Sequence, residues 1–479
     1  MIELLLAFAS ENEKNGDWTG AEILYRGLLK DYPEHPVAAF RLGSLLLRRG
    51  AVEESADLLG QALDADPTFT EAYIQLGNLR QAQGNNDLAM RLLMIGTYLQ
   101  GIKINPTDAQ ARFQLAIAFN QADRHRDAAR ANRQALALQP ASAGIHNNLG
   151  ISLQNLLRST EAVAAHRRAV TLAPTNADFH CNLAHALLAS GLLKEGFAEW
   201  EWRTPSPPRD FAQPKWNGSS FAGKVLLAHA EQGYGDVLQF CRYLPETAAL
   251  GGRLVVECRP PLSGLLGRLP GVSQVVEWGQ PLPAFDLQIA IPSLAFALGV
   301  DRVSTPAPYL RASTKRLPLW QERIGRAPFK VGLVWAGNAA GHDPKRAIPI
   351  EDLVTLANIP GATLFSLQRD GTSTGVTNPI AVDLGAQIAD FDDLAAAIDC
   401  LDLVISVDTA AAHLAGALGK PVWTLLHASP DWRWLPDATT TAWYPSMRLY
   451  RQSTPGDWSG VMAKVAADLE KFVPTRARP

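Results

Sequence analysis

The strongest constraint in this sequence is a repeat that fills its first two hundred residues. Proline recurs in steps of 34 residues, and a small residue recurs with the same step. The prolines are Pro33, Pro67, Pro106, Pro140 and Pro174, and the small residues are Gly43, Gly77, Ala116, Gly150 and Ala184. Each series contains one longer step of 39, so five residues are inserted near the segment RLLMIGTYLQ. Such a period predicts similar units that stack and bury their apolar faces against one another.

The unit resembles the tetratricopeptide repeat, a pair of antiparallel helices. The resemblance rests on the small residue of the first helix, the closing proline, and an alanine of the second helix, found at Ala21, Ala89, Ala128 and Ala162. Small residues let paired helices approach closely, and proline ends the second helix because it cannot donate a backbone hydrogen bond. We expect five full repeats and a truncated sixth over residues 1–200, stacked into an α-helical solenoid with a concave face.

A row of side-chain amides is expected along that concave face. The residue two positions before each small residue is Arg41 in the first case. In the other four it is a side-chain amide: Gln75, Gln114, Asn148 and Asn182. A carboxamide has donors and an acceptor, so a row of them can bond the backbone of an extended peptide without reading its side chains. The row predicts either an acceptor groove for a protein or peptide, or an ordinary polar helix face.

After the repeats, the sequence changes to short apolar segments separated by helix-like ones. The expected strands are KVLLAH, RLVVEC, SQVVEW and FDLQIA in one half, and KVGLVWAG, ATLFSL, AVDLG, DLVISV and PVWTLL in the other. Such runs predict two parallel sheets covered on both faces, with a ligand at the carboxyl ends of the strands. The predicted divisions are a packed junction at 201–222, a first half at 223–312, a crossover at 313–326, and a second half with a final helix at 327–479.

Composition narrows the class of protein. Lys and Arg number 44 against 47 Asp and Glu, a net charge of −3, so no basic field favours nucleic acid or an anionic membrane. The four cysteines are far apart and lack metal-ligand or disulfide spacing, which predicts a reducing compartment. No apolar run is long enough to span a bilayer. We therefore expect a cytoplasmic protein with no nucleic-acid partner and no membrane span.

One cluster of acids raises the question of a metal site. Asp390, Asp392 and Asp393 open a helix-like segment, ADFDDLAAAI. Carboxylates in a first helical turn interact favourably with the helix dipole, and we interpret the cluster in that way. No metal site and no bound cofactor are expected.

The first strand runs into the segment HAEQGYGDVLQF, which allows two interpretations. Gly233 and Gly235 begin like a dinucleotide fingerprint, with Glu257 in the place of a ribose-binding acid. Leu238 occupies the third glycine position, however, and Asp236 would face the pyrophosphate with a negative charge. A carboxylate on a glycine turn at a strand end suits general acid–base chemistry better, unless Asp236 only offsets the helix dipole.

Several motifs in order resemble glycosyltransferase family 9, the heptosyltransferase-like enzymes. They are GDV at 235–237, WAGN at 335–338, DPKRAIP at 343–349 and SVDTAAAHLAGALGKP at 406–421. Residues 195–472 are similar to the bacterial branch in which tetratricopeptide repeats precede this domain. The resemblance implies a helical repeat solenoid followed by an α/β domain of the GT-B type, with two Rossmann-like halves.

The resemblance also implies a donor site at the segment DTAAAH. In the family, the helix that starts there holds the diphosphate of a nucleotide-sugar at its N-terminus, where free N–H groups and the dipole attract anions. Thr409 would add a hydrogen bond, and Asp408 would bind a sugar hydroxyl or cap the turn. His413 would donate to a phosphate oxygen or stiffen the loop, although a lone histidine on an apolar helix can also be a satisfied core residue.

Further donor contacts are implied elsewhere in the second half. Lys345 matches the family lysine that contacts phosphate, and Arg346 stands beside it as a second cation. Asn338 and Gln368 end the first two strands and are candidates for contact with the donor sugar or base. Ala410 stands where relatives commonly have glycine, which leaves less room for a phosphate beside the backbone.

These features favour a metal-independent glycosyltransferase that uses a nucleotide-sugar donor. Asp236 would deprotonate the acceptor hydroxyl, while Lys345, Arg346 and the helix at 408–413 would stabilise the departing diphosphate. The repeats suggest that the acceptor is a protein held in their groove. Two alternatives stay open: an interaction scaffold whose second domain is inactive or only binds nucleotide, and a heptosyltransferase acting on lipopolysaccharide or another glycan.

Overall fold

A computed structural model describes residues 1–303, 307–337, 344–357, 359–369, 382–435 and 438–476. Of residues 344 and 474–476 it describes the backbone only. The chain divides into two compact units, Met1–Asn182 and Leu183–Pro479. The division falls inside a helix of the last repeat, whereas the sequence analysis placed the end of the repeats at residue 200. Each unit is described separately.

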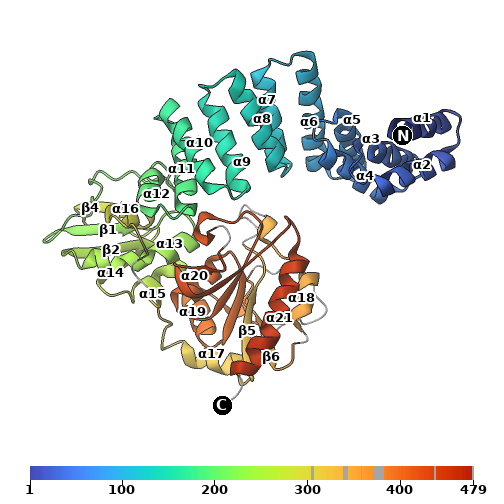
Figure 1. Cartoon of the computed structure of the whole chain (residues 1–479). Coiled ribbons are helices and arrows are strands. Elements are labelled where there is room, and N and C mark those ends of the chain that lie inside the picture. The colour runs from blue at the N-terminus through green and yellow to red at the C-terminus, as the bar shows by residue number, and fades with distance from the viewer. Residues whose placement is uncertain (304–306, 338–343, 358, 370–381, 436–437, 477–479) are drawn as a thin grey trace. The chain divides into compact units, whose positions relative to one another are not determined.

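The first unit is a row of antiparallel helix pairs (Figure 1). The helices are α1 (Ile2–Lys14), α2 (Trp18–Asp31), α3 (Pro36–Arg48), α4 (Val52–Ala65), α5 (Thr70–Ala82), α6 (Asn86–Ile104), α7 (Ala109–Gln121), α8 (His125–Leu138), α9 (Ala143–Asn155), α10 (Ser159–Leu172) and the start of α11 (Ala177–Ala189). The helix α6 has 19 residues, whereas α4 and α8 have 14 each, so the five inserted residues lengthen this one helix.

The turn within each helix pair repeats with the same period. One residue per pair has a positive φ, at Gly16, Gly50, Gly84, Asp123, Leu157 and Gly191. The steps between them are 34, 34, 39, 34 and 34 residues, the series already seen for proline. Glycine adopts this backbone conformation without steric cost, so it occupies four of the six turns.

The small residues lie where two helices touch. A Cβ atom on Gly77 would lie 2.8 Å from Leu93 Cγ, and one on Gly150 would lie 2.5 Å from the His166 ring. These glycines are therefore required by close helix packing, as the repeat pattern predicts.

The second unit begins with the end of α11 and with α12 (Leu193–Trp200). Leu188 of α11 and Phe197 of α12 share one hydrophobic core with the first sheet. That sheet has four parallel strands in the order β3-β2-β1-β4. Its elements are β1 (Val225–His229), α13 (Tyr234–Phe240), α14 (Leu244–Ala248), β2 (Arg253–Cys258), α15 (Ser263–Leu266), β3 (Val272–Glu277), β4 (Leu287–Ala290) and α16 (Leu294–Ala297).

After α17 (Leu317–Ile324) comes a seven-stranded sheet of order β10-β11-β9-β8-β5-β6-β7, parallel except for the β10–β11 pair. Its elements are β5 (Phe329–Val334), α18 (Ile350–Ala357), β6 (Ala362–Ser366), β7 (Val382–Asp383), α19 (Phe391–Asp399), β8 (Leu403–Val407), α20 (Ala410–Ala417), β9 (Val422–Leu426), β10 (Thr440–Thr441), β11 (Tyr444–Arg451) and α21 (Trp458–Arg476). The helices α18 and α21 cover one face, and α19 and α20 cover the other (Figure 1).

The predicted fold class, a helical repeat region followed by an α/β domain with parallel sheets, is confirmed. All nine expected strand segments contain a strand. The strands β10 and β11 are missing from the prediction. The segment YPSMRLYR of β11 mixes proline and arginine with its apolar residues and lacks a continuous apolar run.

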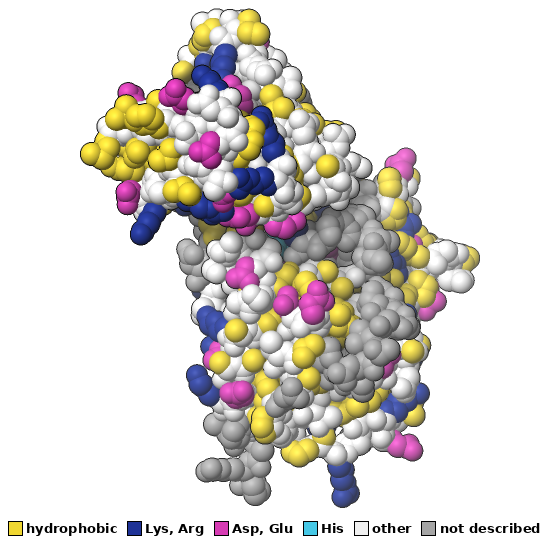
Figure 2. Space-filling model, turned by 90° about the vertical axis from the view of Figure 1, so that its right-hand side faces the viewer, with side chains coloured by type: hydrophobic (Ala, Val, Ile, Leu, Met, Phe, Trp, Pro, Cys, Tyr) yellow, Lys and Arg dark blue, Asp and Glu magenta, His cyan; other side chains and the backbone are white. Residues whose placement is uncertain are grey.

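Charges on the surface are mixed in sign. On the face shown in Figure 2, basic and acidic side chains are interspersed with hydrophobic ones. This mixture agrees with the net charge of −3.

Candidate active site

Asp236 lies in the first turn of α13, the first helix after β1. The left-handed residue of the turn is Gln232, with φ 64°, and Gly233 has an ordinary φ of −78°. One carboxylate oxygen of Asp236 accepts a hydrogen bond from the Gly233 N–H at 3.0 Å, and the other accepts one from the Arg433 guanidinium. The side chain of Asp236 stays 22% exposed. Asp236 therefore stabilises its own helix and still has acceptor capacity toward solvent.

Gly235 explains why the first turn of α13 lies so close to α20. A Cβ atom at residue 235 would lie 2.9 Å from His413 Cδ2. The glycine therefore allows close approach of the two helices, and this role differs from the pyrophosphate contact of a dinucleotide fingerprint. The contact places Asp236 beside the segment 408–413 that the sequence analysis identified separately.

Arg433 joins the two halves of the second unit. It lies in a 3₁₀ turn, Trp432–Trp434, and donates to Asp431 at 2.8 Å as well as to Asp236 and Gln239. Burial raises the pKa of Asp431, but the adjoining guanidinium outweighs this effect and holds the pKa below its usual range. The sequence analysis missed Arg433; the available signal was a charged residue between two tryptophans in the segment DWRW.

Asp408 has a cationic partner. Its carboxylate lies 3.2 Å from an Arg346 nitrogen, and the same nitrogen lies 3.4 Å from the Asp408 carbonyl oxygen. Burial raises the pKa of Asp408, and Arg346 opposes that shift. Arg346 is thus held at the start of α20, where the sequence analysis expected a phosphate-binding cation.

Thr409 occupies the position before the first residue of α20. Its hydroxyl lies 3.1 Å from the Ser406 hydroxyl, and within the described part of the chain its side chain does not cap the helix. The Thr409 side chain therefore does not occupy the first amide groups of α20.

His413 is buried and fixed by aromatic neighbours. Its Nδ1 lies 2.8 Å from the Tyr444 hydroxyl, and its ring centroid is 5.3 Å from that of Trp434. Burial lowers the pKa of His413 to about 3, so the ring is neutral near pH 7. Its Nε2 points toward Asp408 at 3.9 Å. His413 is thus a buried residue with a hydrogen-bond partner on β11.

Two of the remaining predicted donor residues, Gln368 and Lys345, lie among the residues that the structure describes. Gln368 is buried, and its Oε1 accepts from the Ala336 N–H at 3.2 Å, so it holds the end of β5 in place. Lys345 is exposed in the 3₁₀ turn Pro344–Arg346, beside Arg346. Asn338 lies outside the described residues.

The acids at the start of α19 are ion-paired. Asp390 caps the helix through the Asp393 N–H at 2.9 Å, and both residues pair with Arg316, at 2.8 and 2.6 Å. Asp392 pairs with Arg268 at 2.5 Å. Among the residues that the structure describes, no group of three acidic, histidine or cysteine side chains could hold a metal ion.

The amide row lies on the first helices of four successive repeats, α5, α7, α9 and α11. Several of these amides bond to neighbouring side chains within the first unit. Gln75 accepts from Ser44 at 2.6 Å, Asn148 donates to Asn132 at 3.2 Å, and Asn182 donates to Asn147 at 3.1 Å. Gln114 is half-buried on α7. Some of the amide groups expected to bond a peptide therefore form hydrogen bonds within the repeats instead.

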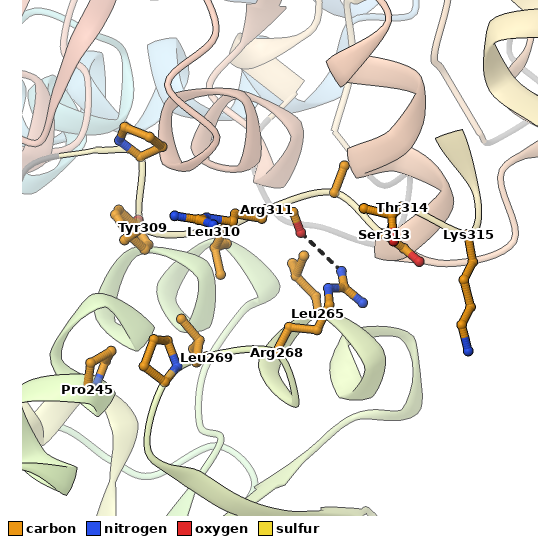
Figure 3. Close-up of a pocket in the computed structure, with 13 residues that line it drawn as sticks. Pro245, Leu265, Arg268, Leu269, Tyr309, Leu310, Arg311, Ser313, Thr314 and Lys315 are labelled. Atoms are coloured by element: carbon orange, nitrogen blue, oxygen red, sulfur yellow. Dashed lines mark hydrogen bonds between the residues drawn. The ribbon is translucent and has the colours of Figure 1, made fainter. Parts of the chain in front are cut away.

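A separate groove of about 870 Å³ lies between α15 and the segment 308–315 (Figure 3). Its charged lining is basic and consists of Arg268, Arg311 and Lys315. Arg268 donates to the Arg311 carbonyl oxygen at 3.1 Å across one edge of the groove. None of the site residues predicted from the sequence lines it.

Comparisons with known proteins match both parts of the chain. Residues 6–68 match the family model of the tetratricopeptide repeat, and residues 378–455 match that of glycosyltransferase family 9 (heptosyltransferase). The second match includes α20 and Arg433.

No helix within the described residues combines the length and apolar character needed to cross a membrane.

Protein FlbA of Caulobacter vibrioides is 28% identical over 329 residues, which are 60% of this chain and 54% of that protein. The chain thus matches about half the length of this relative. A glycosyl transferase family 9 structure from Veillonella parvula is 11% identical over 55% of this chain and 99% of its own, with a TM-score of 0.42. The Thermus thermophilus tetratricopeptide protein TTC0263 is 22% identical over 39% of this chain and 100% of its own, with a TM-score of 0.21.

The helix pairs of the first unit, the parallel sheets of the second and the two family matches lead to one conclusion. The chain combines N-terminal helix pairs, of which residues 6–68 match the tetratricopeptide repeat, with a C-terminal α/β unit, in which residues 378–455 match glycosyltransferase family 9.

Proposed function

We propose that this chain transfers a sugar from a nucleotide-sugar to a hydroxyl group of a protein acceptor, without a metal ion. The observation that carries the proposal is the contact of Gly235 with His413, which places a partly exposed carboxylate beside the start of α20. A carboxylate can deprotonate the acceptor hydroxyl, and a helix N-terminus can receive the departing diphosphate. The two groups that the reaction needs thus come from opposite halves of one unit.

The donor diphosphate would lie at the N-terminus of α20, near Arg346 and Lys345. Arg346 already neutralises Asp408, whose carboxylate would otherwise repel phosphate. The Thr409 side chain does not cap the helix in the described structure, which favours access of phosphate to its first amides. In this arrangement Lys345 supplies an exposed cation for the charge of the leaving group.

The donor site can be tested by calorimetry with UDP, GDP, ADP and CMP. Lys345→Ala should weaken binding of the preferred nucleotide by about 1 to 3 kcal/mol, the scale of a charge-assisted hydrogen bond. Lys464→Ala, which removes a lysine of α21, serves as the matched control and should bind normally. Equal affinity of the Lys345 variant and the unmodified chain would move the phosphate site elsewhere.

The reaction itself can be tested with a panel of nucleotide-sugars and proteins captured by the repeats. Intact-mass measurement should show one or more sugar increments on a captured protein, and released nucleoside diphosphate should match them in amount. A captured protein that gains no sugar with any donor would contradict the proposal and leave only the scaffold alternative.

A further inference from the structure

Arg433 is held by side chains from both halves of the second unit. Its Nε donates to Gln239 and its Nη2 to Asp236, both on α13 of the first half. Its Nη1 donates to Asp431, on the loop after β9 in the second half, at 2.8 Å. The side chain is only 9% exposed. A guanidinium is the one side chain whose rigid fork can serve three acceptors at once.

Residues of the second half also contact Arg433. The backbone N–H of Arg433 donates to Asp431 at 3.0 Å, and its guanidinium lies 4.5 Å from the centroid of the Trp432 ring. Trp432 in turn packs edge-on against Trp443, with centroids 5.8 Å apart. Apart from its bond to Asp236, Arg433 is therefore oriented by Asp431 and Trp432 of its own half and by Gln239 of α13.

Asp236 has fewer constraints from its own half. The helix α13 has seven residues, and within it the carboxylate bonds only through one oxygen to the Gly233 N–H. The other oxygen is oriented by Arg433 from the opposite half. General base catalysis requires the carboxylate to lie within hydrogen-bond reach of the acceptor hydroxyl, so its orientation matters for turnover.

We propose that Arg433 is a positioning residue that orients the Asp236 carboxylate when the two halves stand in the arrangement seen here. The inference rests on the proposed function of Asp236 as the general base. It means that the Asp236 carboxylate is fully oriented only when the second half is in place, so deprotonation of the acceptor depends on the contact between the two halves.

The main test replaces Arg433 with methionine and with lysine. Either variant should lower kcat about 10- to 100-fold while changing the donor KM less than about twofold, because orientation is lost and donor contacts are kept. Arg433→Lys retains the charge and guards against the case in which Arg433→Met fails to fold. The control is Arg268→Met, which breaks another ion pair between the halves, to Asp392, and should leave kcat within about twofold. An equal loss in the control would reduce Arg433 to a structural role.

A double-variant cycle makes the mechanism specific. If Arg433 acts through Asp236, the variant Asp236→Asn/Arg433→Lys should turn over no more slowly than Asp236→Asn alone. Multiplied losses would show independent action and overturn the inference. A parallel cycle of urea unfolding measures the Asp236–Arg433 coupling without any activity, and additive unfolding energies would also overturn it. If the unmodified chain transferred no sugar from any donor, the proposed function would be contradicted instead, even if urea unfolding showed coupling between Asp236 and Arg433.

Discussion

The repeats and the α/β unit organise their polar side chains at very different distances along the chain. In the repeats, the amide contacts Asn148–Asn132, Ser44–Gln75 and Asn182–Asn147 span 16, 31 and 35 residues, about one repeat or less. In the α/β unit, Arg433 reaches Gln239 and Asp236 across 194 and 197 residues. Polar contacts of the first kind join the same or adjacent repeats, whereas those of the second kind join segments nearly two hundred residues apart.

This difference predicts different sensitivity to substitution. A repeat array distributes its stability over many similar neighbour contacts, so one altered amide changes little. A contact that joins two halves at the candidate site has no second copy in the described structure, so its loss should affect function directly. The following predictions test this contrast from the largest expected effect to the smallest.

Asp236→Asn should lower transfer by about 100-fold or more, the usual scale for a lost general base, because an amide cannot take the acceptor proton. Binding of the nucleoside diphosphate should remain within about twofold by calorimetry, and the circular dichroism spectrum should be unchanged. Near-normal turnover would show that Asp236 only stabilises the start of α13, and the contrast between the two units would lose its main support.

Acid should destabilise the α/β unit through His413. Its pKa is lowered to about 3 by burial, whereas a histidine in the unfolded chain titrates near 6.5. Between these values the unfolded state binds more protons, so stability falls as pH falls below 6.5, by about 2 kcal/mol at pH 5. Eleven of the twelve tryptophans lie in this unit, so urea unfolding can be followed by their fluorescence. His413→Phe should flatten the pH dependence by a similar amount; an unchanged slope would argue against a buried neutral ring.

Gly235→Ala should cost about 1 to 3 kcal/mol of stability, the scale of overpacking, because its Cβ would lie 2.9 Å from a histidine that Tyr444 and Trp434 hold in place. The control is Gly101→Ala on α6, where a Cβ would meet no atom within 4 Å. There alanine should stabilise by about 0.5 to 1 kcal/mol through its higher helix propensity. Unfolding followed by circular dichroism measures both, and effects of the same sign would contradict the predicted contact.

Replacing Gln75, Gln114, Asn148 and Asn182 together with alanine should raise the KM for a protein acceptor about threefold to tenfold. Donor hydrolysis without acceptor should stay unchanged, since the catalytic groups lie in the other unit. Single replacements should each have effects below about twofold, as the distributed contacts of a repeat array imply. A single amide that accounts for the whole effect would break the contrast between the two units.

Much of the fold could be predicted from the sequence because its signals are local. The period of 34 residues, the added step of five and the nine apolar segments all correspond to elements of the structure. The strand β11 escaped prediction because Arg448 and Arg451 interrupt its apolar residues, and only pairing with β9 shows that it continues the sheet.

The candidate site was only partly predictable. Asp236 was identified from its position after a strand, and Asp408 and His413 from the resemblance to glycosyltransferase family 9, yet the sequence did not reveal that Gly235 packs on His413. It also did not reveal Arg433, because a charged residue among tryptophans has no local signature of its partners. Gln368 shows the converse: it follows the strand β6, but its side chain accepts a hydrogen bond from Ala336 inside the protein.

The sequence by itself determined the order of repeats and sheets and the chemical types of residue that follow the strands. These depend on hydrophobic periodicity and backbone propensity, which act within a few turns of the chain. Only the tertiary structure decided that α13 meets α20 and that one arginine serves Asp236 and Asp431 together. The physical reason is that such contacts depend on how two sheets, built from segments nearly two hundred residues apart, bury one shared hydrophobic core.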